Sequence, residues 1–239
     1  MANKGILYLI PTHLDNSNNA DFYSFRMLEE IKEIDHFIVE NLRNARRFLS
    51  SLKLGLLIEK LKITELPKGG DVTKIMNLAK TLTNGQNMGL LSDAGFPCIA
   101  DPGASFVCYC HQVDVPVKPI TGHSSIIMAL ISSGFNGQQF YFHGYLPIDQ
   151  KQKLNKIREM EKNTNSTGMT QLFMETPYRN DQLLESLFKV LHPDTYLSIA
   201  VDISGKEERI LTKSIEKWKM INLSFRKRPA IFSIGLPQL

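Results

Sequence analysis

Residues 90–103 read LLSDAGFPCIADPG and follow an apolar run that begins at Met88. That run is short and bounded by polar residues and glycine, which predicts a strand buried on both faces of a parallel sheet. The loop after it contains two glycines, two prolines and two aspartates, so its backbone is permissive at some positions and stiff at others. Open α/β sheets bind ligands at the carboxyl ends of their strands. We therefore expect a binding loop here, the alternative being an ordinary turn between a strand and a helix.

The first half of the chain alternates short apolar runs with amphipathic segments. We expect strands at 5–10, 36–39, 63–66, 88–91 and 115–119, with helices between them. Asp21 and Asp71 stand at N-cap positions of two of these helices. Phe25, Leu28 and Ile31 form the expected apolar face of the first helix. Strands that alternate with helices predict βαβ units and a mostly parallel sheet.

Two phosphate-binding signatures are missing from this half. No G-x-G-x-x-G follows the first strand, and no G-x-x-x-x-G-K-[ST] occurs anywhere in the chain. Their absence disfavours a nicotinamide-binding Rossmann domain, a P-loop NTPase and the commonest methyltransferase fold, which has a glycine-rich loop after its first strand.

The pattern changes after Pro119. Strands are expected at 140–144, 172–174, 196–201, 209–211 and 229–234, with helices at 126–133, at 148–164 and after Thr176-Pro177. We predict an N-terminal α/β domain over residues 1–119, with a mostly parallel sheet, and a C-terminal α+β domain over residues 120–239, with a mixed sheet.

Composition sets broad limits on function. The chain has 239 residues, a net charge of +4 and 43% hydrophobic residues, which fits a globular protein whose partner can be, but need not be, a nucleic acid. Three cysteines without a C-x-x-C pair argue against a disulfide framework or a structural zinc site, and we expect no metal. The apolar run near the N-terminus is too short for a signal peptide or a membrane helix. These features predict a cytoplasmic protein with no membrane partner.

Several charged residues suggest chemistry, and each has a structural alternative. Glu40 follows the second strand, where it is either a general base or a structural residue that pairs with Arg43 or with a nearby helix start. The helix expected over 41–52 also carries Arg46 and Arg47. We interpret Asp101 as a turn residue. Two basic clusters are either solvated faces or RNA contacts: Lys151, Lys153, Lys156, Arg158 and Lys162 in one, and Arg226, Lys227 and Arg228 in the other.

The 92–103 loop resembles the S-D-A-G-T-P-G-I-S-D-P-G signature of the tetrapyrrole methylase superfamily. The resemblance is greatest to its small-subunit ribosomal RNA 2'-O-ribose methyltransferase branch. Other segments resemble family motifs in the same order: 5–12 (G-x-L-Y-L-V-P-T), 121–134 (P-G-P-S-A…A-L-S-A-S-G), 140–147 (F-x-F-x-G-F-L-P) and 173–179 (F-Y-E-S-P-H-R). The resemblance implies two α/β domains, S-adenosylmethionine bound in an active-site cleft between them, and a homodimer.

The resemblance also implies roles for particular residues. Glu40 and Arg43 keep the glutamate and arginine of the family's A-E-D-T-R motif and would be catalytic. The cofactor would be bound by Leu14, Asp93, Ala94, Phe96, Ser124, Ser125, Met174, Pro229 and Ala230. These residue types supply hydroxyl and carboxylate groups for the amino acid part of the cofactor and apolar walls for its adenine.

Departures from the family motifs leave the substrate open. The loop after the first strand has His13 in place of a proline, and Asn41 and Leu42 replace an acid and a hydroxyl residue. The family's R-E-L-T-K motif is changed over 201–205, so its arginine and lysine are missing. We predict an S-adenosylmethionine-dependent methyltransferase acting on ribosomal or other structured RNA at a ribose hydroxyl. The alternatives are a tetrapyrrole or modified protein side chain as substrate, and a degenerate paralogue that binds cofactor or RNA without turnover.

Overall fold

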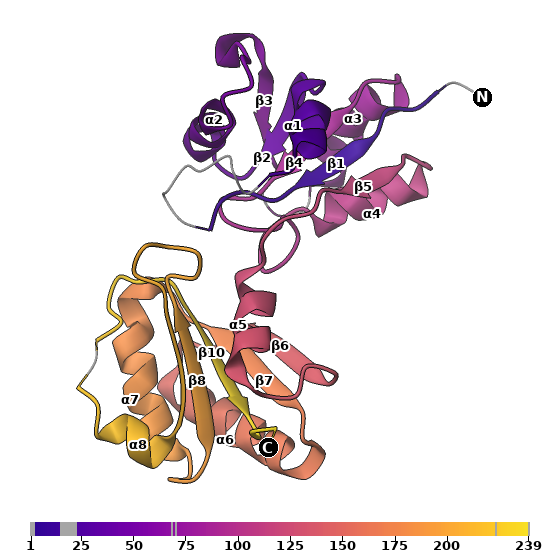
Figure 1. Ribbon diagram of the computed structural model, residues 1–239. Coiled ribbons are helices and arrows are strands. Elements are labelled where there is room, and N and C mark those ends of the chain that lie inside the picture. The colour runs from indigo at the N-terminus through magenta and orange to yellow at the C-terminus, as the bar shows by residue number, and fades with distance from the viewer. Residues whose placement is uncertain (1–2, 15–22, 68, 70, 223, 239) are drawn as a thin grey trace. The chain divides into compact units, whose positions relative to one another are not determined.

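The computed structural model describes residues 3–14, 23–67, 69, 71–222 and 224–238. The chain forms two compact units, Met1–Ser124 and Ser125–Leu239 (Figure 1). The predicted domain boundary, residue 119, is the last residue of strand β5 (Val117–Pro119), and the division into compact units comes a few residues later.

The first unit is built on a five-stranded sheet with the order β3-β2-β4-β1-β5. All four strand pairs described in it are parallel. Its other strands are β1 (Leu7–Ile10), β2 (His36–Val39), β3 (Lys62–Glu65) and β4 (Met88–Leu91). Both β2 and β4 are buried along their whole length, as expected for strands covered on two faces.

Helices cover both faces of this sheet, because every parallel connection must cross over it. They are α1 (Phe25–Lys32), α2 (Leu42–Ser51), α3 (Val72–Thr83) and α4 (Ala104–Gln112), with a 3₁₀ turn, η2 (Ile58–Lys60), after α2. Residues of α1 and α2 share one buried cluster with Phe37 and Val39, whereas residues of α3 and α4 share another with Ile38. Successive β2 side chains therefore point to opposite helical layers.

Side-chain caps fix where these helices begin. The Asp71 carboxylate accepts a hydrogen bond from the Lys74 amide, so the predicted cap of α3 is confirmed. Asp21 lies outside the described residues, and Ser24 caps α1. The prediction that Phe25 belongs to the apolar face of α1 is wrong, because its side chain is 79% exposed. Phe25 precedes the buried Ile31 by six residues, which turn an α-helix by about 600°. The two side chains are therefore about 120° apart around the helix axis.

The second unit has a mixed five-stranded sheet with the order β6-β7-β10-β8-β9. Its strands are β6 (Phe140–Tyr145), β7 (Thr170–Met174), β8 (Tyr196–Val201), β9 (Arg209–Ser214) and β10 (Ala230–Gly235). β6 and β7 are parallel, and the other neighbours are antiparallel. The predicted fold class, a parallel sheet followed by a mixed sheet, is confirmed.

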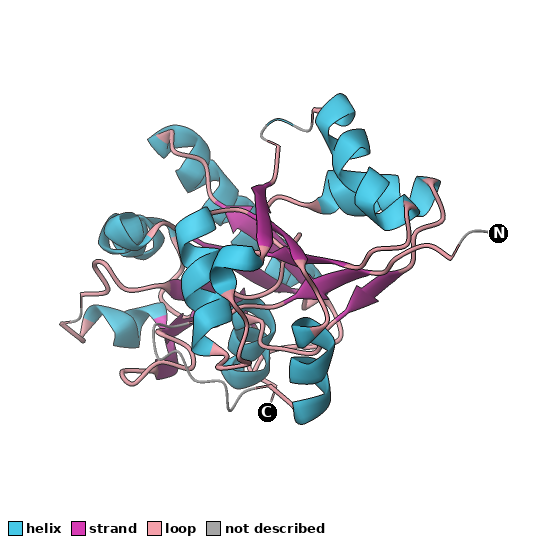
Figure 2. Cartoon of the chain, turned by 90° about the horizontal axis from the view of Figure 1, so that it is seen from above, coloured by secondary structure: helices cyan, strands magenta, loops and turns pink. Residues whose placement is uncertain are grey.

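The helices of the second unit are α5 (Ser125–Ser133), α6 (Gln150–Thr167), α7 (Asn180–Val190) and α8 (Ile215–Lys219). Residues of α6, α7 and α8 share a core with Phe173 and Phe232, while α5 packs on β8, β9 and β10. Thr176-Pro177 opens a 3₁₀ turn, η4 (Pro177–Arg179), and α7 follows it. Figure 2 shows the helices in cyan joined to the strands in magenta. No helix of the described residues is both long and apolar enough to cross a membrane.

Candidate active site

Strands β2 and β4 lie side by side, and the chain leaves them in opposite directions. From β2 it continues to β3 at one edge of the sheet, and from β4 it crosses to β5 at the other edge. A strand pair of this kind opens a crevice at its carboxyl ends, which is where open α/β sheets bind ligands. Val39 pairs with Leu91, so Glu40 and Ser92 are the first residues beyond the two strands.

The loop after β4 is held against the loop after β1. Thr12 and Gly95 exchange two backbone hydrogen bonds, of 2.9 and 3.3 Å, and the Ser92 hydroxyl donates to the Gly95 carbonyl at 2.7 Å. Gly95 has a φ of +77°, and a Cβ there would lie 3.1 Å from Leu14 Cδ2. Glycine is needed at this position for both reasons. The contact brings Leu14, a predicted cofactor residue, against the long loop.

Three carboxylates meet at the crevice. The Asp93 amide donates a hydrogen bond to the Glu40 carboxylate, which lowers the pKa of Glu40. Two larger effects raise that pKa above its usual range: desolvation of the carboxyl group, and the negative charge of Asp93. Burial, followed by the charges of Glu40 and Asp93, raises the pKa of Asp101 to about 6. Asp101 was predicted to be a turn residue only, so its place beside Glu40 was missed.

The negative charge of the three carboxylates favours the binding of a cation and the acceptance of a proton. No ion pair within the described part of the chain involves Glu40, Asp93 or Asp101. The described residues also contain no group of His, Cys, Asp and Glu arranged to hold a metal ion. A carboxylate with a raised pKa is a better proton acceptor near neutral pH. The uncompensated negative charge attracts a positively charged ligand.

Arg43 lies in the first turn of α2, with its side chain exposed. It forms no ion pair with Glu40 in the structure as described, so the structural alternative for Glu40 is wrong in that form. The side chain of Asn41 caps α2 by accepting from the amides of Arg43 and Asn44, at 2.9 and 3.1 Å. Asparagine caps a helix as well as aspartate does, so the change at Asn41 preserves the local fold.

The other predicted cofactor residues fall into two sets, one in each unit. Ala94 is exposed and Phe96 is half-buried in the long loop, and the half-buried Ser124 ends the first unit. In the second unit, Ser125 begins α5. Met174, Pro229 and Ala230 gather at one end of the second sheet, because Met174 pairs with Ile231, the residue after Ala230. The roles of all these residues in cofactor binding stay predictions.

Comparison with known proteins shows the family of this chain. No family model matches the chain. Curated proteins named ribosomal RNA small subunit methyltransferase I match it over most of its length. The protein from Halalkalibacterium halodurans is 29% identical over 214 residues, which is 90% of this chain and 70% of that protein. The one from Vibrio cholerae is 30% identical over 205 residues, which is 86% of this chain and 67% of that protein. The chain belongs to the ribosomal RNA small subunit methyltransferase I family.

Solved structures agree on the fold. The crystal structure of uroporphyrin-III-C-methyltransferase from Thermus thermophilus matches with a TM-score of 0.56 and 15% identity, covering 97% of this chain and 92% of that one. At this identity the likeness shows the fold alone. Together with the curated relatives, it confirms that the chain is a methyltransferase of the tetrapyrrole methylase superfamily, as its motifs predicted.

The F-Y-E-S-P-H-R motif of the family forms a buried ionic cluster here. The Glu175 carboxylate accepts from the Thr176 amide at 2.8 Å and from Arg179 at 2.6 and 3.0 Å. Lys153 Nζ lies 3.6 Å from the other carboxylate oxygen of Glu175, and the Lys153 side chain is only 5% exposed. The prediction that this lysine belongs to an exposed basic cluster is therefore wrong. The cluster fixes the chain immediately after Met174.

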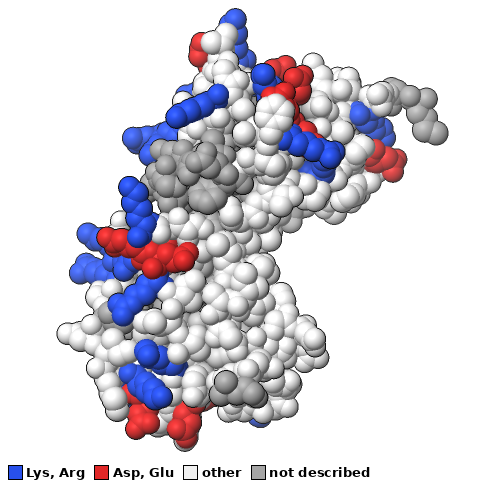
Figure 3. Space-filling model, viewed as in Figure 1, with Lys and Arg blue, Asp and Glu red and all other residues white. Residues whose placement is uncertain are grey.

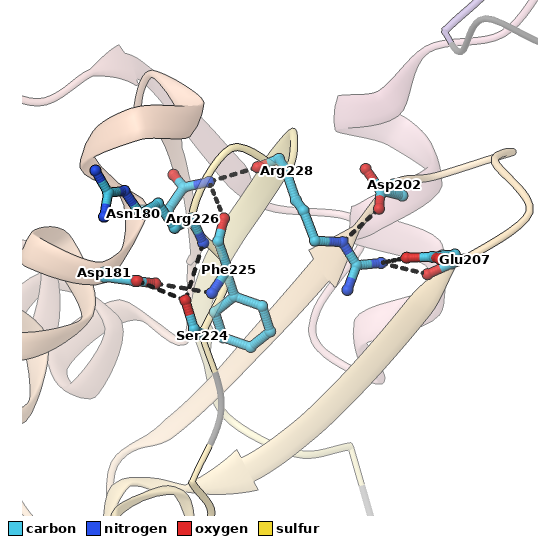
Figure 4. A network of polar contacts seen from close by, with 8 residues as sticks. All are labelled: Asn180, Asp181, Asp202, Glu207, Ser224, Phe225, Arg226 and Arg228. Atoms are coloured by element: carbon cyan, nitrogen blue, oxygen red, sulfur yellow. Dashed lines mark hydrogen bonds and ion pairs between the residues drawn. The ribbon is translucent and has the colours of Figure 1, made fainter.

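Residues 201–205, where the family's R-E-L-T-K motif is changed, include one partner of an ion pair. Asp202, in the loop after β8, accepts from Arg228 Nε at 2.5 Å, and Arg228 also donates to the Glu207 carbonyl at 2.6 Å (Figure 4). Arg228 thereby holds two loops together. The two alternatives for the second basic cluster, a solvated face and RNA contacts, stay predictions. Figure 4 also shows residues 225–228 tied to α7, because Asn180 donates to the Arg228 carbonyl and Asp181 accepts from the Phe225 amide.

Proposed function

We propose that this protein is an S-adenosylmethionine-dependent methyltransferase that methylates a ribose 2'-hydroxyl of small-subunit ribosomal RNA. The observation that carries the proposal is Glu40, a carboxylate with a raised pKa at the crevice between β2 and β4. Methylation at a ribose oxygen requires a group that removes the proton of the hydroxyl. The names of the relatives support ribosomal RNA as the substrate.

The residues of the first unit fit the cofactor. S-adenosylmethionine carries an ammonium and a sulfonium group, and Asp93 and Asp101 supply negative charge that no described cation neutralises. The Thr12 hydroxyl oxygen is buried and has no hydrogen-bond partner among the described residues, although its backbone pairs with Gly95. A buried hydroxyl of this kind requires a partner, which a ligand or a water molecule supplies. Leu14 and Phe96 add apolar surface.

The chemistry assigns distinct tasks to the residues at the crevice. The cofactor supplies an electrophilic methyl group when it is bound. Glu40 accepts the proton of the ribose hydroxyl, and the Asp93 amide holds the Glu40 carboxylate in place. Desolvation and the charge of Asp93 keep the pKa of Glu40 raised, while burial and the charges of Glu40 and Asp93 raise the pKa of Asp101. Arg43, exposed three residues after Glu40, orients the RNA through a phosphate.

The proposal is tested by methyl transfer from labelled S-adenosylmethionine to small ribosomal subunits that lack ribose methylation. Wild-type protein should label the RNA, and nuclease digestion should locate the label on a ribose oxygen. Label on a base, or transfer only to a tetrapyrrole or to protein, would overturn the ribose proposal. Contacts of Ser124, Ser125, Met174, Pro229 and Ala230 with the cofactor are proposed by family resemblance. So is the homodimer, which stays a prediction.

A further inference from the structure

A pocket of about 640 Å³ lies on the first unit, and its lining includes none of the three carboxylates. The C-terminal half of α2, the turn after it and η2 form its walls, which are lined by Arg46, Arg47, Ser50, Ser51, Lys53 and Ile58. Residues four apart on a helix lie on the same face. Arg46 therefore stands one turn from Ser50, and Arg47 one turn from Ser51. Figure 3 shows Lys and Arg side chains gathered over α2.

The charge of this pocket is uncompensated. Its lining includes two guanidinium groups and one ammonium group, and no carboxylate. No ion pair described in the structure involves Arg46, Arg47 or Lys53. A concave surface with charges of one sign concentrates the electrostatic potential and attracts counter-ions. Arginine is well suited to phosphate, because its planar donors bind two oxygens at once.

The backbone holds Lys53 in an unusual conformation. Its φ is +52°, in the left-handed region that lysine rarely adopts, directly after α2 and its cap residue Leu52. Glycine or asparagine fits this conformation with less strain. A left-handed residue commonly ends a helix at this position. Here the strained turn carries an ammonium group to the pocket wall.

The pocket is connected to the candidate active site through α2 and through His13. Asn41, the residue after Glu40, caps α2, and Arg46 lies four residues beyond the first helical residue, Leu42, about 6 Å along the helix axis. His13 Nε2 lies 3.4 Å from Ser51 Oγ, and the His13 ring packs on Tyr23 and Phe48. His13 belongs to the loop that pairs with Gly95, and it stands where the family motif has a proline. His13 therefore links the pocket wall to the loop after β1, whose Thr12 pairs with Gly95 of the long loop.

We propose that this pocket binds a backbone phosphate of the RNA substrate, close to the nucleotide that enters the active site. The inference rests on the proposed function, since it requires RNA as the substrate. Phosphate contacts fix the register and orientation of a nucleic acid without reading its sequence. The pocket would thus position the RNA, while Glu40 acts on one ribose.

The test measures RNA binding as a function of salt, with a labelled transcript of small-subunit ribosomal RNA. The pocket variant is R46Q/R47Q, and the matched control is K151Q/K162Q, which removes two exposed positive charges from α6. Each lost phosphate contact should reduce the slope of log affinity against log salt by about 0.7–0.9. The pocket is proposed to hold one phosphate, so the pocket variant should flatten the slope by about 0.7–0.9, and the control should leave it unchanged. Ligand-free melting temperatures confirm that both variants fold.

Each other outcome has a defined meaning. If wild type methylates RNA but the pocket variant has the slope of the control, the pocket proposal is overturned and the proposed function stands. If the variant loses only stabilisation by inorganic phosphate while keeping the RNA slope, the pocket binds a free anion, and the RNA inference is again overturned. If wild type neither binds nor methylates RNA, the proposed function and the pocket inference fall together.

Discussion

The backbone amide of Asp93 donates a hydrogen bond to the carboxylate of Glu40, joining the loops that follow two neighbouring parallel strands. One residue thereby acts on Glu40 in two opposing ways. The amide stabilises the charged form of Glu40, whereas the Asp93 carboxylate and desolvation destabilise it, and the pKa of Glu40 is raised on balance. The hydrogen bond fixes where the carboxylate points, and the charge sets how readily it takes up a proton.

The E40Q variant should lower turnover by about 10²–10⁴-fold if Glu40 is the general base, because glutamine keeps the shape and cannot accept the proton. E65Q is the matched control, since Glu65 is an exposed glutamate at the carboxyl end of the adjacent strand β3. Methyl transfer and ligand-free melting temperature are measured for both. Equal turnover in the two variants, with both folded, would remove Glu40 from the mechanism.

The pH profile should report the charge of Asp93. A base works in its deprotonated form, so activity should fall as the pH is lowered through the raised pKa of Glu40. The D93N variant keeps the backbone amide and removes the repelling charge, so the pKa of Glu40 should fall and the acidic limb of the profile should move to lower pH at saturating cofactor. The D35N variant changes an exposed aspartate of the same unit and should leave the limb in place. An unmoved limb in D93N would show that the charge of Asp93 does not act on Glu40.

Stability should depend on pH through Asp101. The pKa of Asp101 is about 6 in the folded protein and 3.8 ordinarily, so the folded state binds more protons between these two values. Stability from this group is therefore greatest below pH 4 and declines as the pH rises to about 6. D101N should raise the melting temperature at pH 7, and the gain should shrink toward pH 4. A constant difference across this range would contradict the assignment.

The buried ionic cluster predicts a contrast between two nearby lysines. K153M should destabilise the protein by about 3 kcal/mol, because it removes one of the partners of the fully buried Glu175 carboxylate. K151M changes an exposed lysine of the same helix and should alter stability by less than about 0.5 kcal/mol. Urea unfolding gives both values. A small effect for K153M would mean that Arg179 alone satisfies Glu175.

The sequence predicted most elements because their signals are local. Short apolar runs identified the strands, and the Asp71 cap identified the start of α3. The burial of Lys153 also has a local signal in the sequence. Lys153, Ile157, Met160 and Thr164 recur at helical spacing and form the buried stripe of α6. A lysine in such a stripe requires a buried acid, which Glu175 supplies.

Other features depend on contacts between segments far apart in sequence. Arg228 looked like part of an exposed basic cluster, but it pairs with Asp202, 26 residues earlier. Asp101 has the sequence context of a turn, and only the fold brings it near Glu40. The pocket over α2 is similar, since its arginines were visible in the sequence while the positive φ of Lys53 was not. Residue type and spacing cannot specify which distant group a side chain will meet.

The K53N variant separates the strain at Lys53 from its charge. Asparagine tolerates the left-handed conformation, which costs other residues about 1–2 kcal/mol, so stability should be unchanged or higher by up to about 1 kcal/mol. RNA affinity should nevertheless fall, because the ammonium group is lost from the pocket. K151N is the control for charge, and urea unfolding and RNA titration are measured on each variant. Full RNA affinity in K53N would exclude Lys53 from the phosphate site.

The cofactor itself provides the broadest test, because it probes the crevice without any substrate. S-adenosylmethionine and S-adenosylhomocysteine should raise the melting temperature, since a ligand that binds only the folded state stabilises it by about 2.7 kcal/mol at a hundredfold excess over its Kd. ATP should have no effect, as the chain lacks a P-loop. D93A should reduce the shift by removing a carboxylate from the crevice, while D35A should retain it. If neither sulfur compound shifts the melting temperature of the wild type, the cofactor proposal is contradicted. If D93A shows the same shift as the wild type, the cofactor binds elsewhere than at the three carboxylates.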